Sequence, residues 1–159
     1  NLSSTIKKFI KMTHPIVYLT RKESISSCHR LHSNNLNDEE NKMIYGKCNN
    51  FWGHGHNYTV EVTVRGPLDP ITGMVMNISD LKRYMKNVLM DRLDHKNLDK
   101  DVSYFKNVVS TTENLAIYIY NELKKELPNP DLLYEVKIHE TDNNIVYYRG
   151  DIYDKREFK

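Results

Sequence analysis

The chain lacks several features that mark particular classes of protein. Its 159 residues contain only two cysteines, no apolar run long enough to cross a membrane, and no internal repeat or low-complexity tract. Cys28 and Cys48 could in principle pair, but a single disulfide is less common than two thiols in a chain that is not exported, so we expect free thiols and a cytoplasmic location. A membrane partner is not expected either.

Excess charge of one sign is also missing. The formal net charge is +2, and acidic and basic residues are mixed along the chain. No basic stripe with interleaved aromatics stands out, which argues against a nucleic-acid partner. The length and the 39% hydrophobic content fit one domain with a modest core. We predict an N-terminal extension at 1–15, a domain at 16–150 and a C-terminal tail at 151–159.

Hydrophobic periodicity predicts four strands and two helices in the order β-β-α-α-β-β. The strands are predicted at 16–31, 56–65, 132–141 and 144–149, and the helices begin near Ser79 and Ser110. This order predicts an α+β fold, in which two helices cover one face of a four-stranded antiparallel sheet. The polar stretch 32–51 is predicted to be a long loop, and Ser110 to Glu113 matches a capping box.

Three histidines carry the most chemical information. His54 and His56 lie at i and i+2 on an extended segment between glycines, so their side chains point to the same side. His29 ends a neighbouring predicted strand and supplies a third imidazole. Three neutral nitrogens with no fourth ligand are typical of a catalytic zinc site. The alternative is a chance feature of strand composition. His14, His32 and His139 have no such setting and are predicted to lie at the surface or the rim.

Further polar residues are candidates for chemistry, each with a simpler alternative. Glu140 occupies an apolar-facing position of its strand, where it could accept paired N–H donors from a flat heterocycle or simply reach solvent. Asp94 could set the tautomer and basicity of its neighbour His95, although adjacent residues rarely hold the right geometry for each other. Cys48 precedes the histidine pair and could be an inert loop thiol, and Glu113 is explained by the helix cap alone.

Together these segments resemble the 6-pyruvoyl-tetrahydropterin synthase family. The matching stretches are 26–31 (SSCHRL), 46–50 (GKCNN), 53–58 (GHGHNY), 73–77 (GMVMN), 93–98 (LDHKNL), 109–114 (VSTTEN) and 140–144 (ETDNN). They follow the family's order from about residue 24 to 150. The resemblance implies the T-fold, whose subunits form trimeric barrels that stack into a hexamer with active sites between subunits.

The resemblance also implies a role for each candidate. His29, His54 and His56 would hold Zn²⁺. Cys48 would be the proton-abstracting base, with Asp94 and His95 completing a proton relay. The ring of the substrate would be anchored by Glu140, Thr111, Thr112 and Glu113. The substrate would be 7,8-dihydroneopterin triphosphate, which loses triphosphate as its side chain rearranges to a diketone, and Mg²⁺ would accompany the triphosphate.

Glu23 departs from the pattern expected for the animal enzymes of this family. An even number of residues separates it from His29, so both side chains would lie on the same face of the strand. It lies six residues earlier, however, roughly 20 Å away along a straight strand. Pairing with Arg21 or Lys22 would explain it. Some microbial and parasite members carry an active-site glutamate and release 6-hydroxymethyl-7,8-dihydropterin for folate synthesis, so this product is the alternative. A non-catalytic pterin-binding protein is a further, more remote alternative.

Overall fold

The computed structural model of the protein describes residues 14–154, so most of the predicted extension and the end of the predicted tail lie outside it. The strands are β1 (Ile16–His29), β2 (His54–Pro67), β3 (Lys96–Asn97), β4 (Leu133–His139) and β5 (Ile145–Tyr148). The helices are α1 (Asp38–Tyr45), α2 (Ile78–Met85), α3 (Leu98–Asp101) and α4 (Thr112–Glu126). A π-helical turn, η2 (Lys86–Met90), extends α2, and 3-10 turns occur at η1 (Gly46–Asn49), η3 (Ser103–Lys106) and η4 (Pro130–Leu132).

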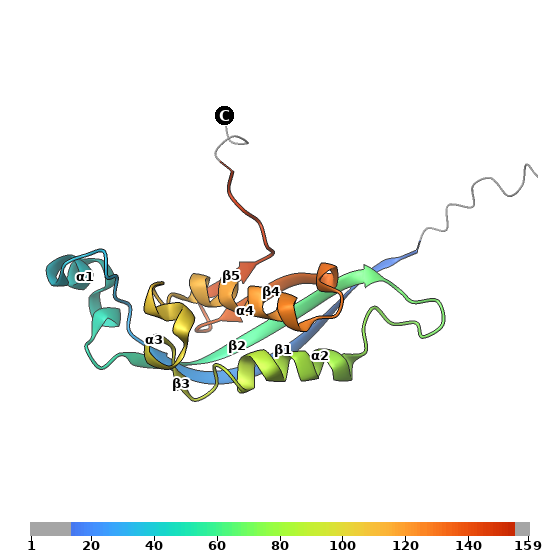
Figure 1. The fold of residues 1–159 in the computed structure, drawn as a ribbon, viewed down its shortest axis with the longest axis horizontal. Helices are drawn as coiled ribbons and strands as arrows, with labels where there is room; N and C mark the ends of the chain where they lie inside the picture. The colour runs from blue at the N-terminus through green and yellow to red at the C-terminus, as the bar shows by residue number, and fades with distance from the viewer. Residues whose placement is uncertain (1–13, 155–159) are drawn as a thin grey trace, which may run out of the picture.

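The strands form one sheet in the order β3-β1-β2-β4-β5 (Figure 1). The four predicted strands are present and pair antiparallel, with β1 and β2 matched from Ile16↔Pro67 to His29↔His54. The prediction of four strands was wrong by one, because β3 adds a short parallel pairing to the free edge of β1. Two residues are too few to show a periodicity of their own.

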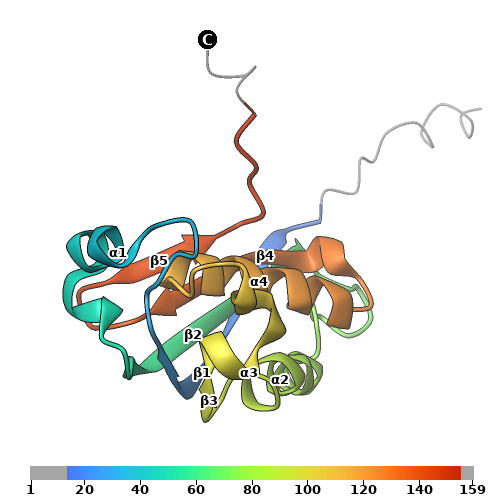
Figure 2. The same ribbon diagram turned by 60° about the vertical axis from the view of Figure 1, so that its left-hand side comes forward.

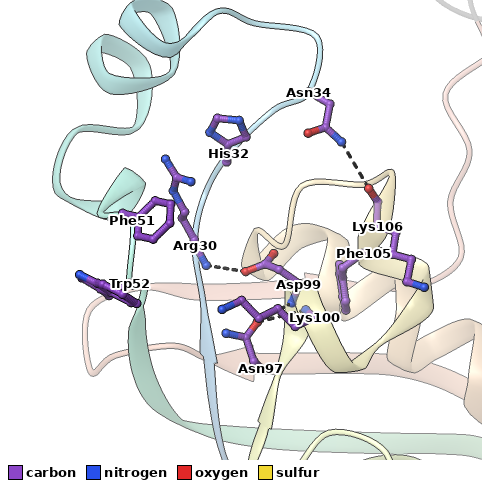
Figure 3. A pocket seen from close by; sticks show the side chains of 10 residues that line it. All are labelled: Arg30, His32, Asn34, Phe51, Trp52, Asn97, Asp99, Lys100, Phe105 and Lys106. Atoms are coloured by element: carbon purple, nitrogen blue, oxygen red, sulfur yellow. Dashed lines mark hydrogen bonds between the residues drawn. The ribbon is translucent and has the colours of Figure 1, made fainter.

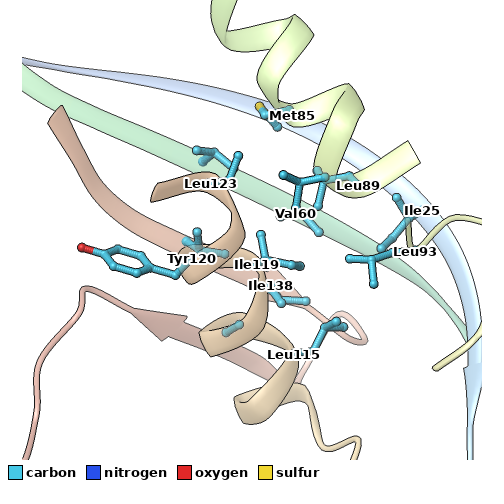
Figure 4. Packing of buried hydrophobic residues seen from close by; sticks show 14 of the residues in the cluster. Ile25, Val60, Met85, Leu89, Leu93, Leu115, Ile119, Tyr120, Leu123 and Ile138 are labelled. Atoms are coloured by element: carbon cyan, nitrogen blue, oxygen red, sulfur yellow. The ribbon is translucent and has the colours of Figure 1, made fainter. Parts of the chain in front are cut away.

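The helices α2 and α4 cover one face of the sheet, as predicted (Figures 1 and 2). Alternate residues of β2 and β4, among them Val60 and Ile138, point into this layer and are completely buried. They pack against Leu89, which follows α2, and against Leu115 and Ile119 of α4 (Figure 4). On the other face of β1, side chains such as Ser24 and Ser26 are polar and exposed. The fold therefore has one buried and one open sheet face.

The prediction of a loop at 32–51 was wrong in part, because this stretch contains α1. Asn37 and Glu40 cap this helix reciprocally, each side chain bonded to the backbone N–H of the other. The buried side of α1 is formed by Asn41, whose amide group donates to the carbonyl oxygens of Ser33 and Leu36. A helix fixed by a buried amide has no apolar stripe, so periodicity could not reveal it.

The start of α4 is also corrected, by one residue. Its N-cap is Thr111, whose hydroxyl accepts from Asn114 N at 3.3 Å, so Glu113 lies in the first turn but is not the capping-box partner. Ser110 is fully buried and makes other bonds. None of the helices within residues 14–154 combines the length and the apolar character that crossing a bilayer requires.

Candidate metal centre and adjoining hollow

The pairing of β1 with β2 brings the three predicted histidines together. His29 lies opposite His54, and Ser27 lies opposite His56, so all three imidazoles are on the helix-covered face. One ring nitrogen from each lies within 4.8 Å of the other two, a grouping that can hold a metal ion. His29 is only 1% exposed, which places the cluster at the edge of the core.

The ring nitrogens of this cluster have the bonding expected of metal ligands. His29 Nδ1 lies 2.6 Å from the carbonyl oxygen of Ser110, and because a carbonyl only accepts, Nδ1 carries the proton and Nε2 keeps its lone pair. That Nε2 lies 3.2 Å from His54 Nε2. His56 Nε2 is buried without a hydrogen-bond partner. A buried polar atom without a partner is costly, and a metal ion would satisfy it.

Burial keeps two of these imidazoles neutral. It is the largest effect on the pKa of His29, and together with the neighbouring His54 and His56 it outweighs the bond to Ser110 and lowers that pKa. Burial likewise lowers the pKa of His56, against the opposing charge of Glu140. Only the neutral ring binds a metal, so the folded chain favours the ligating form.

These lowered pKa values predict how the stability of chelator-treated protein depends on pH. In the unfolded chain both histidines take up a proton near pH 6.5, whereas in the folded chain they stay neutral to a lower pH. The unfolded state then binds more protons, so the free energy of unfolding falls as the pH drops below 6.5. Urea denaturation between pH 7.5 and about pH 5 should show this fall. A free energy that rises over the same range would contradict the assignment.

Gly53 allows β1 and the histidine turn to approach closely. Its φ is +76°, and a Cβ built there would lie 2.6 Å from the carbonyl oxygen of His29. Gly73 has a similar φ of +69° but has open space around it.

We therefore expect Gly53→Ala to lower the free energy of unfolding by about 3 kcal/mol and to weaken metal binding, because the clash displaces His29. Gly73→Ala is the matched control. It should cost about 1 kcal/mol, the backbone penalty alone, and leave metal binding unchanged. Denaturation curves and metal titration of both variants give the comparison, and equal effects would show that the clash is unimportant.

A hollow of about 480 Å³ adjoins the histidines, and the four residues predicted to bind the ring all line it. They are Thr111, Thr112, Glu113 and Glu140. The Thr112 hydroxyl donates to Glu140 Oε1, the Asn144 amide lies 3.4 Å from Oε2, and His56 Nε2 lies 3.9 Å from Oε1. Burial acts to raise the pKa of Glu140, but these three neighbours outweigh it and lower the pKa. The hollow therefore presents an ionised carboxylate.

Asp94 and His95 form the predicted pair at the edge of the sheet. His95 Nδ1 lies 2.7 Å from Asp94 Oδ2, while Asp94 Oδ1 accepts from Ser26 N and His95 N donates to the Ser26 carbonyl oxygen. The bond from Ser26 N is the main reason that the pKa of Asp94 is lowered. His95 has a φ of +58°, uncommon for a residue with a side chain, and its ring is 84% exposed. This ring lines a shallow pocket with Cys28 and Gly55.

Cys48 and Glu23 have other partners within residues 14–154. Cys48 is partly buried in η1, and its carbonyl oxygen accepts from Leu31 N at 2.9 Å, so its backbone adjoins the ring-side hollow that Leu31 lines. Among the residues that the structure describes, Cys48 makes no hydrogen bond with Asp94 or His95. Glu23 is partly buried and pairs with Arg21 at 3.6 Å, one of the two partners expected for it.

The remaining histidines lie outside the metal cluster, and a backbone carbonyl contributes to it. His14 is exposed, His139 binds Glu61 at 2.8 Å on the open sheet face, and His32 lines a second hollow. The Ser110 carbonyl, which orients His29, was not predicted. A backbone carbonyl leaves no residue-type signal, although the position of Ser110 directly before a helix cap could have drawn attention to it.

The fold and the cluster define an α+β protein that can hold a metal ion beside a small hollow containing a carboxylate. The sequence profile of the family described as "6-pyruvoyl tetrahydropterin synthase" matches residues 18–151. The chain belongs to this family of enzymes.

Individual relatives carry the name of the same family. The 6-pyruvoyl tetrahydrobiopterin synthase of Drosophila melanogaster is 64% identical over 136 residues, covering 86% of this chain and 81% of that protein. The Homo sapiens protein of the same name is 60% identical, covering 84% and 91%. A solved structure of Caenorhabditis elegans 6-pyruvoyl tetrahydropterin synthase matches with a TM-score of 0.85 at 53% identity, covering 87% and 98%. A Plasmodium vivax structure at 21% identity, with a TM-score of 0.62, shares the fold.

Proposed function

We propose that the protein is a zinc-dependent lyase that converts 7,8-dihydroneopterin triphosphate to 6-pyruvoyl-tetrahydropterin with loss of triphosphate. The observation that carries this proposal is the convergence of His29, His54 and His56 beside a hollow that contains an ionised carboxylate. The animal relatives named 6-pyruvoyl tetrahydrobiopterin synthase support the same reaction and a place in tetrahydrobiopterin synthesis.

The three histidines would hold Zn²⁺, because three imidazoles are a ligand set of catalytic zinc sites that leaves a position for substrate. When bound there, Zn²⁺ supplies Lewis acidity that makes the C–H bonds beside the substrate's side-chain hydroxyls more acidic. The chain contributes orientation, since the Ser110 carbonyl fixes the proton of His29 on Nδ1 and turns Nε2 toward His54.

The ring of the substrate is proposed to bind at Glu140. A carboxylate with two acceptor oxygens matches the paired N–H donors on one edge of a pterin. Thr112 and Asn144 each donate to one oxygen of Glu140, which fixes the plane of the carboxylate. Thr111 and Glu113 lie beside them on the wall of the hollow, so the ring and the reacting side chain would lie on either side of His56.

Cys48 is proposed to remove the proton, with His95 and Asp94 relaying it. His95 is oriented for such a role, because Asp94 holds its Nδ1 and leaves Nε2 exposed. Among the described residues, no hydrogen bond joins Cys48 to this pair. We therefore propose that the complete site forms between subunits of a homohexamer, a dimer of trimers, in which the edge of one sheet carries His95 to Cys48 of a neighbour. Mg²⁺ would accompany the triphosphate in the cytoplasm.

The alternative product, 6-hydroxymethyl-7,8-dihydropterin, needs a carboxylate base, for which Glu23 is the candidate. Its ion pair with Arg21 and its place six residues before His29 favour the pyruvoyl product instead.

Mass spectrometry of the products formed from 7,8-dihydroneopterin triphosphate, with and without a zinc chelator, tests the proposal. A 6-pyruvoyl-tetrahydropterin peak that the chelator removes is expected. A dominant 6-hydroxymethyl-7,8-dihydropterin peak would assign the chain to folate synthesis, and a bound ring without turnover would leave a binding protein.

A further inference from the structure

A second hollow, of about 280 Å³, lies on the other side of the segment that follows His29. Its lining includes three cationic residues, Arg30, Lys100 and Lys106, and the aromatic side chains of Phe51 and Trp52 (Figure 3). Nothing in the proposed chemistry at Glu140 and the histidines uses it. Phe51 and Trp52 are 70% and 82% exposed, so the wall that they form stands open to solvent.

The cations of this hollow outnumber its one carboxylate. Within residues 14–154, Arg30, Lys100 and Lys106 take part in no ion pair. The one carboxylate in the lining, Asp99, is directed elsewhere, because its Oδ2 accepts from Arg30 N and its Oδ1 accepts from the Ser110 hydroxyl, both at 2.6 Å. The concave surface therefore carries an excess of positive charge, and its cations form no ion pair with the described residues.

Asn49 arranges the donors of the hollow. Its Oδ1 lies 3.4 Å from Arg30 Nη2 and its backbone carbonyl accepts from Arg30 Nε, while the ring of Phe51 lies 5.5 Å from the guanidinium carbon. Because Oδ1 is the acceptor toward Arg30, the amide nitrogen is the donor to His32 Nδ1, at 3.1 Å. His32 then carries its proton on Nε2, which is a donor.

Asn97 completes the set. Its Oδ1 accepts from the backbone N–H groups of Asp99 and Lys100, each at 3.1 Å, so its amide N–H groups are left as donors. The hollow thus combines a guanidinium, two ammonium groups, an imidazole N–H and an amide N–H, while both oxygens of its carboxylate already accept hydrogen bonds. Such a surface suits a ligand that offers only acceptors and negative charge, as a chain of phosphates does.

We propose that this hollow binds a polyphosphate chain, either the triphosphate end of the pterin substrate or free triphosphate. The substrate assignment rests on the proposed function. It is supported by the closeness of this hollow to the histidine cluster and the ring-side hollow along the chain. Arg30, which lines the second hollow, directly follows His29, and the next residue, Leu31, lines the ring-side hollow. Asp99 also ties Arg30 to Ser110, the residue that orients His29.

The test compares Lys100→Gln with Lys82→Gln. Both lysines are exposed and both changes remove one positive charge, but Lys82 lies on α2, away from the hollow. Calorimetric titration with inorganic triphosphate should give a dissociation constant about tenfold higher for Lys100→Gln, the effect of losing one charge-assisted hydrogen bond, and an unchanged one for Lys82→Gln. Equal affinities in wild type and Lys100→Gln, or no binding at all, would overturn the proposal.

Kinetics distinguishes the two sources. If the hollow takes the substrate's own triphosphate, Lys100→Gln raises KM and the inhibition constant of free triphosphate together and leaves kcat near wild type. If it takes only free triphosphate, the inhibition constant rises while KM stays unchanged, and the proposal holds with that source. Wild-type protein that binds triphosphate through Lys100 but forms no pterin product would refute the proposed function and leave the polyphosphate site standing.

Discussion

Replacing Cys48 with alanine should lower kcat for 6-pyruvoyl-tetrahydropterin formation by about 10²- to 10⁴-fold, the range that a positioned general base contributes. The change removes the thiol proposed to take the proton and leaves the histidine cluster intact, because the contact of Cys48 with the site's lining runs through its backbone carbonyl. Folding and metal content should therefore stay at wild-type levels. Steady-state kinetics with product identification measures the effect.

Cys28 provides the matched control, since it is the other partly buried thiol and shares a shallow pocket with His95. Cys28→Ala should retain activity. Loss of activity in Cys28→Ala together with normal activity in Cys48→Ala would show that the base is assigned to the wrong thiol. Hydroxymethyl product that persists in Cys48→Ala and disappears in Cys48→Ala/Glu23→Gln would place the chain with the folate branch instead.

Replacing His54 with alanine should weaken metal binding by more than about 100-fold, because changes to groups that only orient a ligand already cost about 10- to 100-fold. Turnover should fall with it. The side chain is partly exposed at the start of β2, so the fold should tolerate its removal. The number of metal ions per subunit, measured by inductively coupled plasma mass spectrometry before and after dialysis, gives the occupancy of the site directly.

His14→Ala is the control for that experiment, because His14 is an exposed histidine outside the sheet. It should keep full metal content and activity. If His54→Ala also kept a stoichiometric metal ion and normal turnover, the three-histidine centre would not be the site of catalysis. A variant that lost metal but kept turnover would separate the metal from the reaction.

The long periodic elements were predictable because burial repeats along them. The alternation of apolar residues on β2 placed His56 on the helix-covered face. The alternation on β1 placed His29 on the same side as the buried residues of that strand. The register was not predictable. Only the structure shows that His29 lies opposite His54, since a shift by one residue would have turned one set of imidazoles to the open face.

The short elements could not be predicted, because their stabilising contacts are polar or distant in sequence. The helix α1 depends on its caps and on the buried amide of Asn41. The strand β3 exists because His95 and Asp94 bond to both backbone groups of Ser26, 68 or more residues earlier. No local pattern encodes such a pairing, so periodicity predicts four strands where the sheet has five.

The candidate site was predictable as a set of residues, but not as an arrangement. Residue type and motif indicated Glu140 and the Thr111–Glu113 segment, and the structure places them around one hollow. Whether a hydrogen bond joins Cys48 to His95 depends on the tertiary fold, and none does within residues 14–154. The donors of the second hollow were missed because each is an ordinary surface residue, and only their convergence around Asn49 and Asn97 is informative.

The turn that starts α4 has a consequence for substrate choice. Ser110 holds His29 through its carbonyl, and Thr112, two residues later, holds Glu140 through its hydroxyl. One rigid turn thus sets the spacing between the proposed ring anchor and the proposed metal. We expect a pterin whose hydroxyls lie one carbon further from the ring to satisfy these two contacts less well, because Ser110 and Thr112 belong to the same turn. The enzyme should therefore select substrates by chain length as well as by ring chemistry.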